Sequence, residues 1–220
     1  MTVRPYYEQD GIVIYHGDCR EVLPTLQLAD LVLTDPPYGI SADRHPVRGK
    51  QNLAWEAYGD SNWDSERPDA EVFARVLAAG RDQIVWGGNY FADLFPPSQC
   101  WLCWDKGTRD FSLADVELAW TSFDRASRIV TVPRGRAVQD GKVHPTQKSL
   151  GVIEWCFTAI ADKYAPTPPK TIVDPFMGSG TTLVAAKRLG RTAVGIELDE
   201  RYCERAAHRL RQRVLDLFGD

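Results

Sequence analysis

Short apolar runs alternate with amphipathic stretches along the chain. Strands are predicted where an apolar run is brief, at 12–17, 31–35, 82–88, 99–106, 115–123, 127–132, 171–176 and 192–198. Helices are predicted where apolar residues recur three or four positions apart, at 18–26, 67–80, 90–95, 146–164, 178–190 and 199–218. Asp18 and Thr146 are N-cap candidates. Because the last fifty residues alternate strand, helix, strand, helix, the pattern favours one α/β domain over residues 1–220 with a mostly parallel sheet.

One long stretch lacks any such period. Residues 39–67 are polar and mixed in charge. A structureless connection of this length is uncommon in a compact domain unless it is functional. Together with 124–143, which is rich in arginine, this stretch is a candidate loop for contacts with phosphate groups, and in a nucleic-acid enzyme for contacts with DNA.

Composition changes this picture little. The 220 residues are 44% hydrophobic and 25% charged, which is typical of a globular protein. No apolar run reaches the roughly 20 residues that would span a membrane, and the N-terminus lacks an apolar signal core, so we expect a cytoplasmic protein. The five cysteines are a poor disulfide framework. The Cys100–Cys103 pair stands among tryptophans and lacks further metal ligands, so buried thiols are expected and no metal site is predicted.

Charge is distributed unevenly. The net charge of −4 argues against a generally basic, nucleic-acid-binding surface. Basic side chains nevertheless gather in 39–67 and 124–143, where they suit phosphate groups and guanine edges. These candidate DNA-binding residues are Arg44, Arg48, Lys50, Arg125, Arg128, Arg134 and Arg136.

The stretch DPFMGSGTT, residues 174–182, joins a buried strand to a helix. Glycines at 178 and 180 let the backbone turn sharply and let a ligand approach the main chain. Glu197 ends the next strand, where a carboxylate can accept hydrogen bonds from ribose hydroxyls. Neither the dinucleotide fingerprint nor a P-loop is present, so the residues alone indicate an adenosine-containing cofactor without deciding which one.

The stretch LVLTDPPYGI, residues 31–40, ends another buried strand on a carboxylate and two prolines. The prolines fix an extended backbone and leave carbonyl groups that no strand can pair. The Asp35 carboxylate and the Pro36 carbonyl can then accept both N–H bonds of one exocyclic amino group. Tyr38 can stack on the ring that carries this amine. The arrangement suits a nucleobase.

Together these stretches resemble a family. DPPY, DPFMGSGTT and IELDERY are similar to motifs of the S-adenosylmethionine-dependent amino-methyltransferases of DNA. The catalytic motif precedes the cofactor motif, and this circularly permuted order resembles the beta group. HGDCREVLPTL and HPTQKSL also resemble segments of that group, although Ser149 replaces the usual last proline. The resemblance implies a Rossmann-like methyltransferase fold with a mostly parallel, seven-stranded, doubly wound sheet.

The resemblance also implies roles for individual residues. The catalytic positions are Asp35, Pro36, Pro37 and Tyr38. The positions that would bind S-adenosylmethionine are Asp18, His144, Lys148, Asp174, Pro175, Phe176, Gly178, Ser179, Gly180, Thr181 and Glu197. Asp18 corresponds to a contact with the adenine amino group, and Lys148 suits the carboxylate of the methionine moiety by its charge.

The expected reaction is direct methyl transfer to a base flipped out of double-stranded DNA, with no metal and no covalent enzyme intermediate. The initial Asp of DPPY favours adenine N6, with cytosine N4 as the alternative. Methylation of RNA or of a protein glutamine remains open, as does an inactive nucleic-acid-binding partner subunit. Because little sequence is left for target recognition, we expect relaxed specificity and a homodimer that adds DNA contacts, with 146–164 and 115–123 as its candidate edges.

Overall fold

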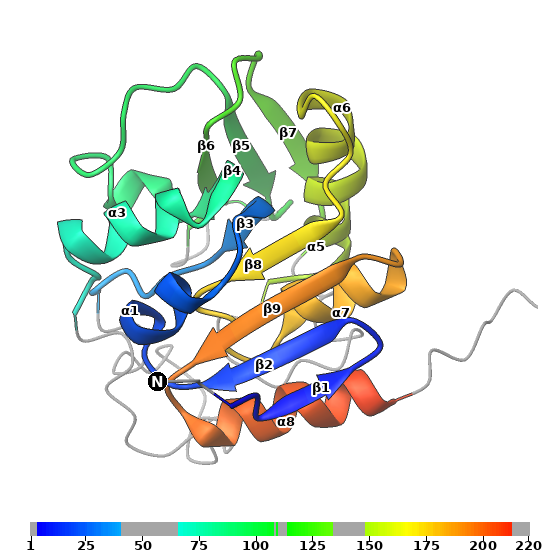
Figure 1. Ribbon diagram of the computed structural model, residues 1–220. Helices are drawn as coiled ribbons and strands as arrows, with labels where there is room; N and C mark the ends of the chain where they lie inside the picture. The colour runs from blue at the N-terminus through cyan, green and yellow to red at the C-terminus, as the bar shows by residue number, and fades with distance from the viewer. Residues whose placement is uncertain (1–3, 41–65, 108, 110–113, 134–147, 213–220) are drawn as a thin grey trace, which may run out of the picture.

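One mixed sheet runs through the protein, with helices on both of its faces (Figure 1). The computed structural model describes residues 4–40, 66–107, 109, 114–133 and 148–212. Within these ranges the sheet has nine strands in the order β1-β2-β9-β8-β3-β4-β6-β5-β7. The strands are β1 Tyr7–Gln9, β2 Ile12–His16, β3 Ala29–Thr34, β4 Gly80–Trp86, β5 Trp101–Asp105, β6 Val116–Thr121, β7 Arg128–Thr131, β8 Thr171–Asp174 and β9 Thr192–Glu197.

The helices lie close to the positions that the sequence predicts. They are α1 Cys19–Val22, α3 Ala70–Ala78, α5 Leu150–Trp155, α6 Asp162–Tyr164, α7 Thr181–Arg188 and α8 Glu200–Arg211. A 3-10 turn, Leu23–Thr25, extends α1, and a π-helical turn, Cys156–Ala161, joins α5 to α6. Asp18 is the N-cap of α1, as predicted, and its side chain accepts a hydrogen bond from the Arg20 N–H.

Alternating residues of the central strands bury their side chains on opposite faces. In β3, Leu31 and Leu33 pack with α5, α7 and α8, while Val32 packs with α1 and α3. All three side chains are fully buried. This double burial explains why the strand is a continuous apolar run, and it confirms the predicted doubly wound α/β fold.

The sheet has nine described strands, whereas the hydrophobic pattern predicts eight and the family resemblance implies seven. The strand that the pattern missed is β1, which forms a hairpin with β2 through Asp10 and Gly11, both with positive φ. Asp-Gly is a favoured pair for such a two-residue turn. β7, which the pattern predicts at 127–132, pairs in parallel with β5 at the far edge of the sheet. Five of the eight strand pairings are parallel, so the sheet is mostly parallel as expected.

Three helix boundaries differ from the prediction. The helix predicted at 90–95 is absent: Tyr90 ends the short 3-10 segment Gly88–Tyr90, which follows Gly87 with its left-handed φ of 71°, and residues 91–95 form turns before two prolines. The helix predicted at 146–164 has its N-cap at Ser149, and Thr146 lies outside the described residues. The last helix is described to Arg211, and 213–220 are not described.

Asp30 ties the beginning of β3 to the beginning of β8. Its Oδ2 atom accepts hydrogen bonds from the N–H groups of Lys170 and Thr171 and from the Thr171 hydroxyl, each at 2.9 Å. These bonds lower the pKa of Asp30 against the opposing effect of burial. The same two strands carry DPPY and the glycine-rich turn at their other ends.

We predict that Asp30→Ala lowers the free energy of unfolding by about 1–2 kcal/mol at neutral pH, because the bonds to a charged acceptor are lost. Since the pKa of Asp30 is lowered in the folded protein, the loss should shrink as the pH falls through the acidic range. Urea unfolding measures both effects.

Asp82→Ala is the matched control. Asp82 lies opposite Leu31 on β4, and burial and the nearby Asp30 raise its pKa. Its removal should leave the stability unchanged or slightly increased. Equal losses in the two variants would contradict the role of Asp30.

Candidate active site

The carboxyl ends of five neighbouring strands line one edge of the sheet. β2, β9, β8, β3 and β4 are adjacent and parallel, so their last residues lie side by side. This edge brings Asp18, Glu197, Asp174 and Asp35 together from segments far apart in the sequence. In open α/β sheets this edge is the usual place for ligands.

A buried hydrogen bond joins the two predicted motifs. The Thr34 hydroxyl, at the end of β3, donates to Asp174 Oδ1 at 2.7 Å. Asp174 Oδ1 also accepts from the Phe176 N–H at 3.2 Å, which holds the start of the turn. Burial, together with the nearby Asp35 charge, raises the pKa of Asp174 to about 6. Asp35 and the glycine-rich turn therefore converge, as the sequence predicts.

The glycine-rich turn leaves room for a ligand. Gly178 and Gly180 have positive φ values of 50° and 78°. A Cβ at Gly180 would lie 2.7 Å from the Ala206 Cβ, so this glycine allows α7 to pack on α8. A Cβ at Gly178 would meet no atom within 4 Å. Ser179 and Thr181 are buried and bond to Arg209, through the Ser179 carbonyl at 2.6 Å and the Thr181 hydroxyl at 3.2 Å.

Glu197 lies directly beside this open space. Its carboxylate accepts hydrogen bonds from the N–H groups of Gly178 at 3.0 Å and Asp199 at 2.9 Å. Burial is the largest influence on this group and raises the pKa of Glu197 to about 7. Asp18 follows the neighbouring strand, where its carboxylate caps α1 and pairs with Arg20 at 2.5 Å. A ribose-accepting carboxylate and an open glycine turn fit the predicted adenosine-containing cofactor.

Both oxygens of Asp35 are engaged. Oδ1 accepts a hydrogen bond from the Tyr38 hydroxyl at 2.6 Å, and Oδ2 bonds to Lys148 Nζ at 2.5 Å. The ammonium group of Lys148 contacts Asp35, the Tyr38 hydroxyl and Glu117, and its predicted contact with the methionine carboxylate of the cofactor stays a prediction. Burial raises the pKa of Asp35, and Lys148 opposes this effect.

The Tyr38 ring has neighbours that sequence reasoning missed. It stacks on Tyr90 with the ring centroids 4.6 Å apart and an angle of 15° between the rings. Gly87, at the end of β4, packs so closely on the ring that a Cβ would lie 2.1 Å from it. The stacking surface predicted for a base is thus part of an aromatic cluster that also includes Phe91.

Glu117 and Lys106 were also missed. Glu117 lies within β6 and pairs with both Lys106, at 2.6 Å, and Lys148, at 2.9 Å. A carboxylate inside the otherwise apolar run VELAW was the available sequence signal. It was not enough on its own, because the partner lysines come from two other segments.

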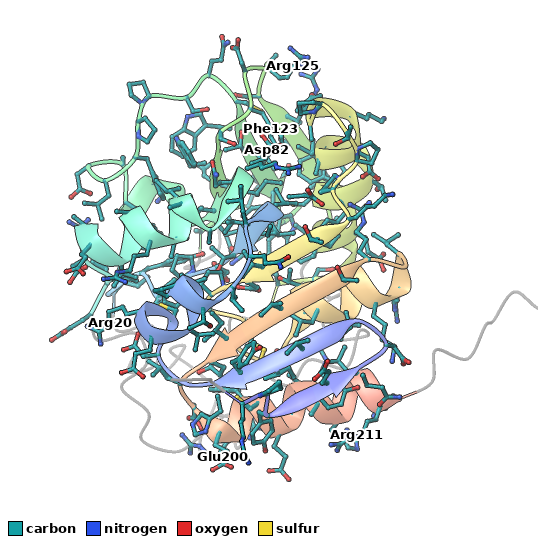
Figure 2. The ribbon with its side chains drawn as sticks, viewed as in Figure 1. Arg20, Asp82, Phe123, Arg125, Glu200 and Arg211 are labelled. Atoms are coloured by element: carbon teal, nitrogen blue, oxygen red, sulfur yellow. The ribbon has the colours of Figure 1, made fainter. Side chains whose placement is uncertain are left out.

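Of the predicted DNA-binding residues, the structure describes Arg125 and Arg128. Arg125 lies between β6 and β7, and Arg128 is the first residue of β7, beyond the end of β6, which runs antiparallel to β4. They therefore lie at the opposite edge of the sheet, and Figure 2 shows Arg125 far from Glu200, which follows β9. Outside the described residues lie Arg44, Arg48, Lys50, Arg134, Arg136 and His144.

All five cysteines carry free thiols; Cys100 is buried and Cys103 is half-buried. In the part of the chain that the structure describes, no group of three histidine, cysteine or acidic side chains is placed to hold a metal ion. The helices of that part are too short or too polar to cross a bilayer.

Comparison with known proteins decides the family. The family model N6_N4_Mtase, described as DNA methylase, matches residues 83–208, more than half of the chain. The chain belongs to this family of DNA methylases. The sequence resemblance is thereby confirmed, and this methylase transfers a methyl group from S-adenosylmethionine to an exocyclic amino group in DNA.

Curated relatives cover nearly all of the chain. The type II methyltransferase M.ScaI of Streptomyces caespitosus is 26% identical over 273 aligned residues, which include 98% of this chain and 86% of the relative. The type II methyltransferase M2.LlaDCHI of Lactococcus lactis subsp. cremoris is 24% identical, with 96% and 93% covered.

Solved structures share the fold. A complex of M1.HpyAVI with SAM has a TM-score of 0.58 at 23% identity and covers 91% of this chain and all of that one. The PvuII DNA methyltransferase, described as cytosine-N4-specific, has a TM-score of 0.62 at 16% identity, with 97% and 91% covered. The methylase therefore has the Rossmann-like fold of S-adenosylmethionine-dependent enzymes.

The raised pKa of Glu197 predicts how the affinity for the cofactor depends on pH. Ribose hydroxyls donate hydrogen bonds, so they favour the ionised carboxylate. Since its pKa is about 7 in the free methylase, affinity should rise about four-fold between about pH 6.5 and about pH 8.5, above most of the Asp174 titration. Glu197→Gln should bind more weakly and lose this dependence. Isothermal titration calorimetry measures both.

Glu200→Gln is the control for this titration. Glu200 is an exposed acid in the first turn of α8, three positions along the chain from Glu197. It should retain the wild-type pH dependence. A dependence that survives in Glu197→Gln would assign it to another group.

Proposed function

We propose that the methylase modifies adenine at N6 and that Asp35, Pro36 and Tyr38 hold the reacting amino group. The observation that carries this proposal is the Thr34–Asp174 hydrogen bond, because it fixes DPPY beside the glycine-rich turn. A base held by Asp35 would then lie within reach of the cofactor. The initial Asp of DPPY supports adenine over cytosine through the family resemblance.

The proposed cofactor contacts follow the same edge. Glu197 would accept hydrogen bonds from the ribose, and Asp18 would accept one from the adenine amino group. The backbone from Asp174 to Gly180, including Pro175 and Phe176, would line the space beside Gly178. When bound, S-adenosylmethionine supplies an electrophilic methyl group on sulfur.

The residues of DPPY would activate the amine. An exocyclic amine conjugated with its ring is a weak nucleophile, because its lone pair is delocalised. Hydrogen bonds accepted by the Asp35 carboxylate and the Pro36 carbonyl draw the nitrogen toward tetrahedral geometry and localise that pair. Pro37 keeps the backbone extended. Each Asp35 oxygen has a second acceptor position besides the one used by Tyr38 or Lys148.

Tyr38 and Tyr90 would form the stacking surface for the flipped base. Tyr90 is partly exposed, with 37% of its surface accessible, whereas the Tyr38 hydroxyl is fixed on Asp35. A base that enters from solvent therefore meets Tyr90 first, and it reaches Tyr38 when Tyr90 moves aside. Stacking on such a ring contributes about 1–3 kcal/mol per base.

We predict that Asp35→Ala reduces methyl transfer to duplex DNA by at least about a hundred-fold, because the amine loses its charged acceptor. Cofactor affinity should change little, because Asp35 does not contact the ribose side. Transfer of labelled methyl groups and calorimetry measure the two effects. Undiminished transfer would remove Asp35 from the chemistry.

The base itself is identified by mass spectrometry of nucleosides from DNA treated with the wild-type methylase. N6-methyl-2′-deoxyadenosine supports the proposal. N4-methyl-2′-deoxycytidine would contradict the adenine assignment while leaving the role of Asp35 intact.

A further inference from the structure

A continuous chain of alternating charges leads to Asp35 from the side of β5 and β6. Lys106 Nζ lies 2.6 Å from Glu117 Oε1, and Lys148 Nζ lies 2.9 Å from Glu117 Oε2 and 2.5 Å from Asp35 Oδ2. The order of charges is positive, negative, positive, negative. The first two members belong neither to DPPY nor to the cofactor turn.

The chain is largely hidden from solvent. The side chains of Lys106 and Lys148 are 3% and 5% exposed, and that of Glu117 is 23% exposed. Buried ion pairs contribute little to stability compared with apolar packing, because both charges lose their hydration. Such an arrangement at the end of DPPY therefore calls for a function other than stability.

The backbone holds Glu117 and Lys106 in place. Glu117 pairs with Trp104 in the register of β5 and β6, and the Lys106 N–H donates to the Asp115 carbonyl at 3.0 Å. Lys148, in contrast, precedes α5 and reaches the site through a long flexible side chain. The position of its ammonium group is thus set by the carboxylates on either side.

Because Asp35 and Glu117 share the Lys148 ammonium group, the Asp35 carboxylate is a stronger hydrogen-bond acceptor than it would be in a pair with Lys148 alone. In an isolated pair, Lys148 would bind Asp35 alone and neutralise the acceptor that the amine needs. Glu117 competes for the same ammonium and weakens that neutralisation. Lys106 in turn limits how strongly Glu117 competes.

We propose that Glu117 and Lys106 are positioning residues that set how strongly Lys148 binds the Asp35 carboxylate, and thereby how well Asp35 accepts a hydrogen bond from the amine. This inference rests on the proposed role of Asp35. Both residues act through Lys148, whose ammonium group contacts Asp35 directly.

The charged and titratable groups facing Asp35 define the test. Among the described residues they are Lys148 before α5, Glu117 on β6, Asp174 on β8 and Tyr38 from the same segment. Lys148 lowers the pKa of Asp35, whereas Glu117 raises it. These two neighbours along the row of charges therefore have opposite effects on the pKa of Asp35.

The experiment is the pH profile of the single-turnover rate at saturating cofactor and DNA, where cofactor affinity no longer matters. Its acidic limb reports the protonation of Asp35 in the complex. Glu117→Gln should shift this limb about one unit to lower pH and lower the plateau about ten-fold, because Lys148 then binds Asp35 alone. Lys106→Met should shift the limb to higher pH and recover the wild-type plateau there.

The double variant Glu117→Gln with Lys106→Met removes a complete pair, so it leaves no buried charge without a partner. It should match Glu117→Gln, because Lys106 acts through Glu117. If Lys106→Met alone does not fold, the double variant still shows whether removing the Glu117 charge shifts the acidic limb. Asp162→Asn is the control: it breaks the Arg191–Asp162 pair, 2.7 Å apart, near the amino end of β9, and should shift no limb.

Opposite shifts in the single variants support the inference. The inference is overturned if the acidic limb shifts in the same direction in both single variants. It is also overturned if the limb is unchanged in folded Glu117→Gln and in the double variant. If the proposed role of Asp35 itself is wrong, Asp35→Asn will retain full methyl transfer. This result separates a failure of the proposed function from a failure of the inference about Glu117 and Lys106. An inactive Asp35→Asn without alternating shifts overturns the inference alone.

Discussion

The parallel alignment of β3 and β8 is the constraint on which the site depends. Parallel neighbours must end at the same edge, so residues about 140 positions apart become adjacent once these strands pair. The Thr34–Asp174 hydrogen bond at one end and the Asp30 bonds at the other hold this alignment. The permuted order of motifs has no effect on the geometry, because the sheet order, not the chain order, decides which ends meet.

This edge concentrates carboxylates that burial makes costly to ionise. The pKa values of Asp35, Asp174 and Glu197 are all raised by loss of hydration. Lys148 is the buried cation among the described residues that opposes this effect at Asp35. The carboxylates at this edge suit a ligand that carries a positive charge, and a sulfonium group has that property. The electrostatics of the fold and the cofactor of the family therefore agree.

The sequence predicted what local pattern and motif order encode. The buried run at 31–35, the glycine turn and Glu197 identified the strands and the edge that they share. Other features could not be predicted, because they depend on contacts between segments without a common motif. Glu117 reads as one polar residue in a strand, and nothing local shows that it meets Lys148. Tyr90 appears as part of a short helix until the left-handed Gly87 places its ring on Tyr38. The hairpin at Asp10 and Gly11, by contrast, could have been predicted, because an Asp-Gly pair favours a two-residue turn between strands.

The central claim is that DPPY and the glycine-rich turn form one pocket in which Asp35 faces the methyl group. A crystal structure of the methylase with S-adenosylmethionine tests it most directly. The account predicts that the ribose hydroxyls bond to Glu197 and that the methyl group points toward the space between Asp35 and Tyr38. A cofactor bound elsewhere, or with its methyl group turned away from Asp35, would contradict it.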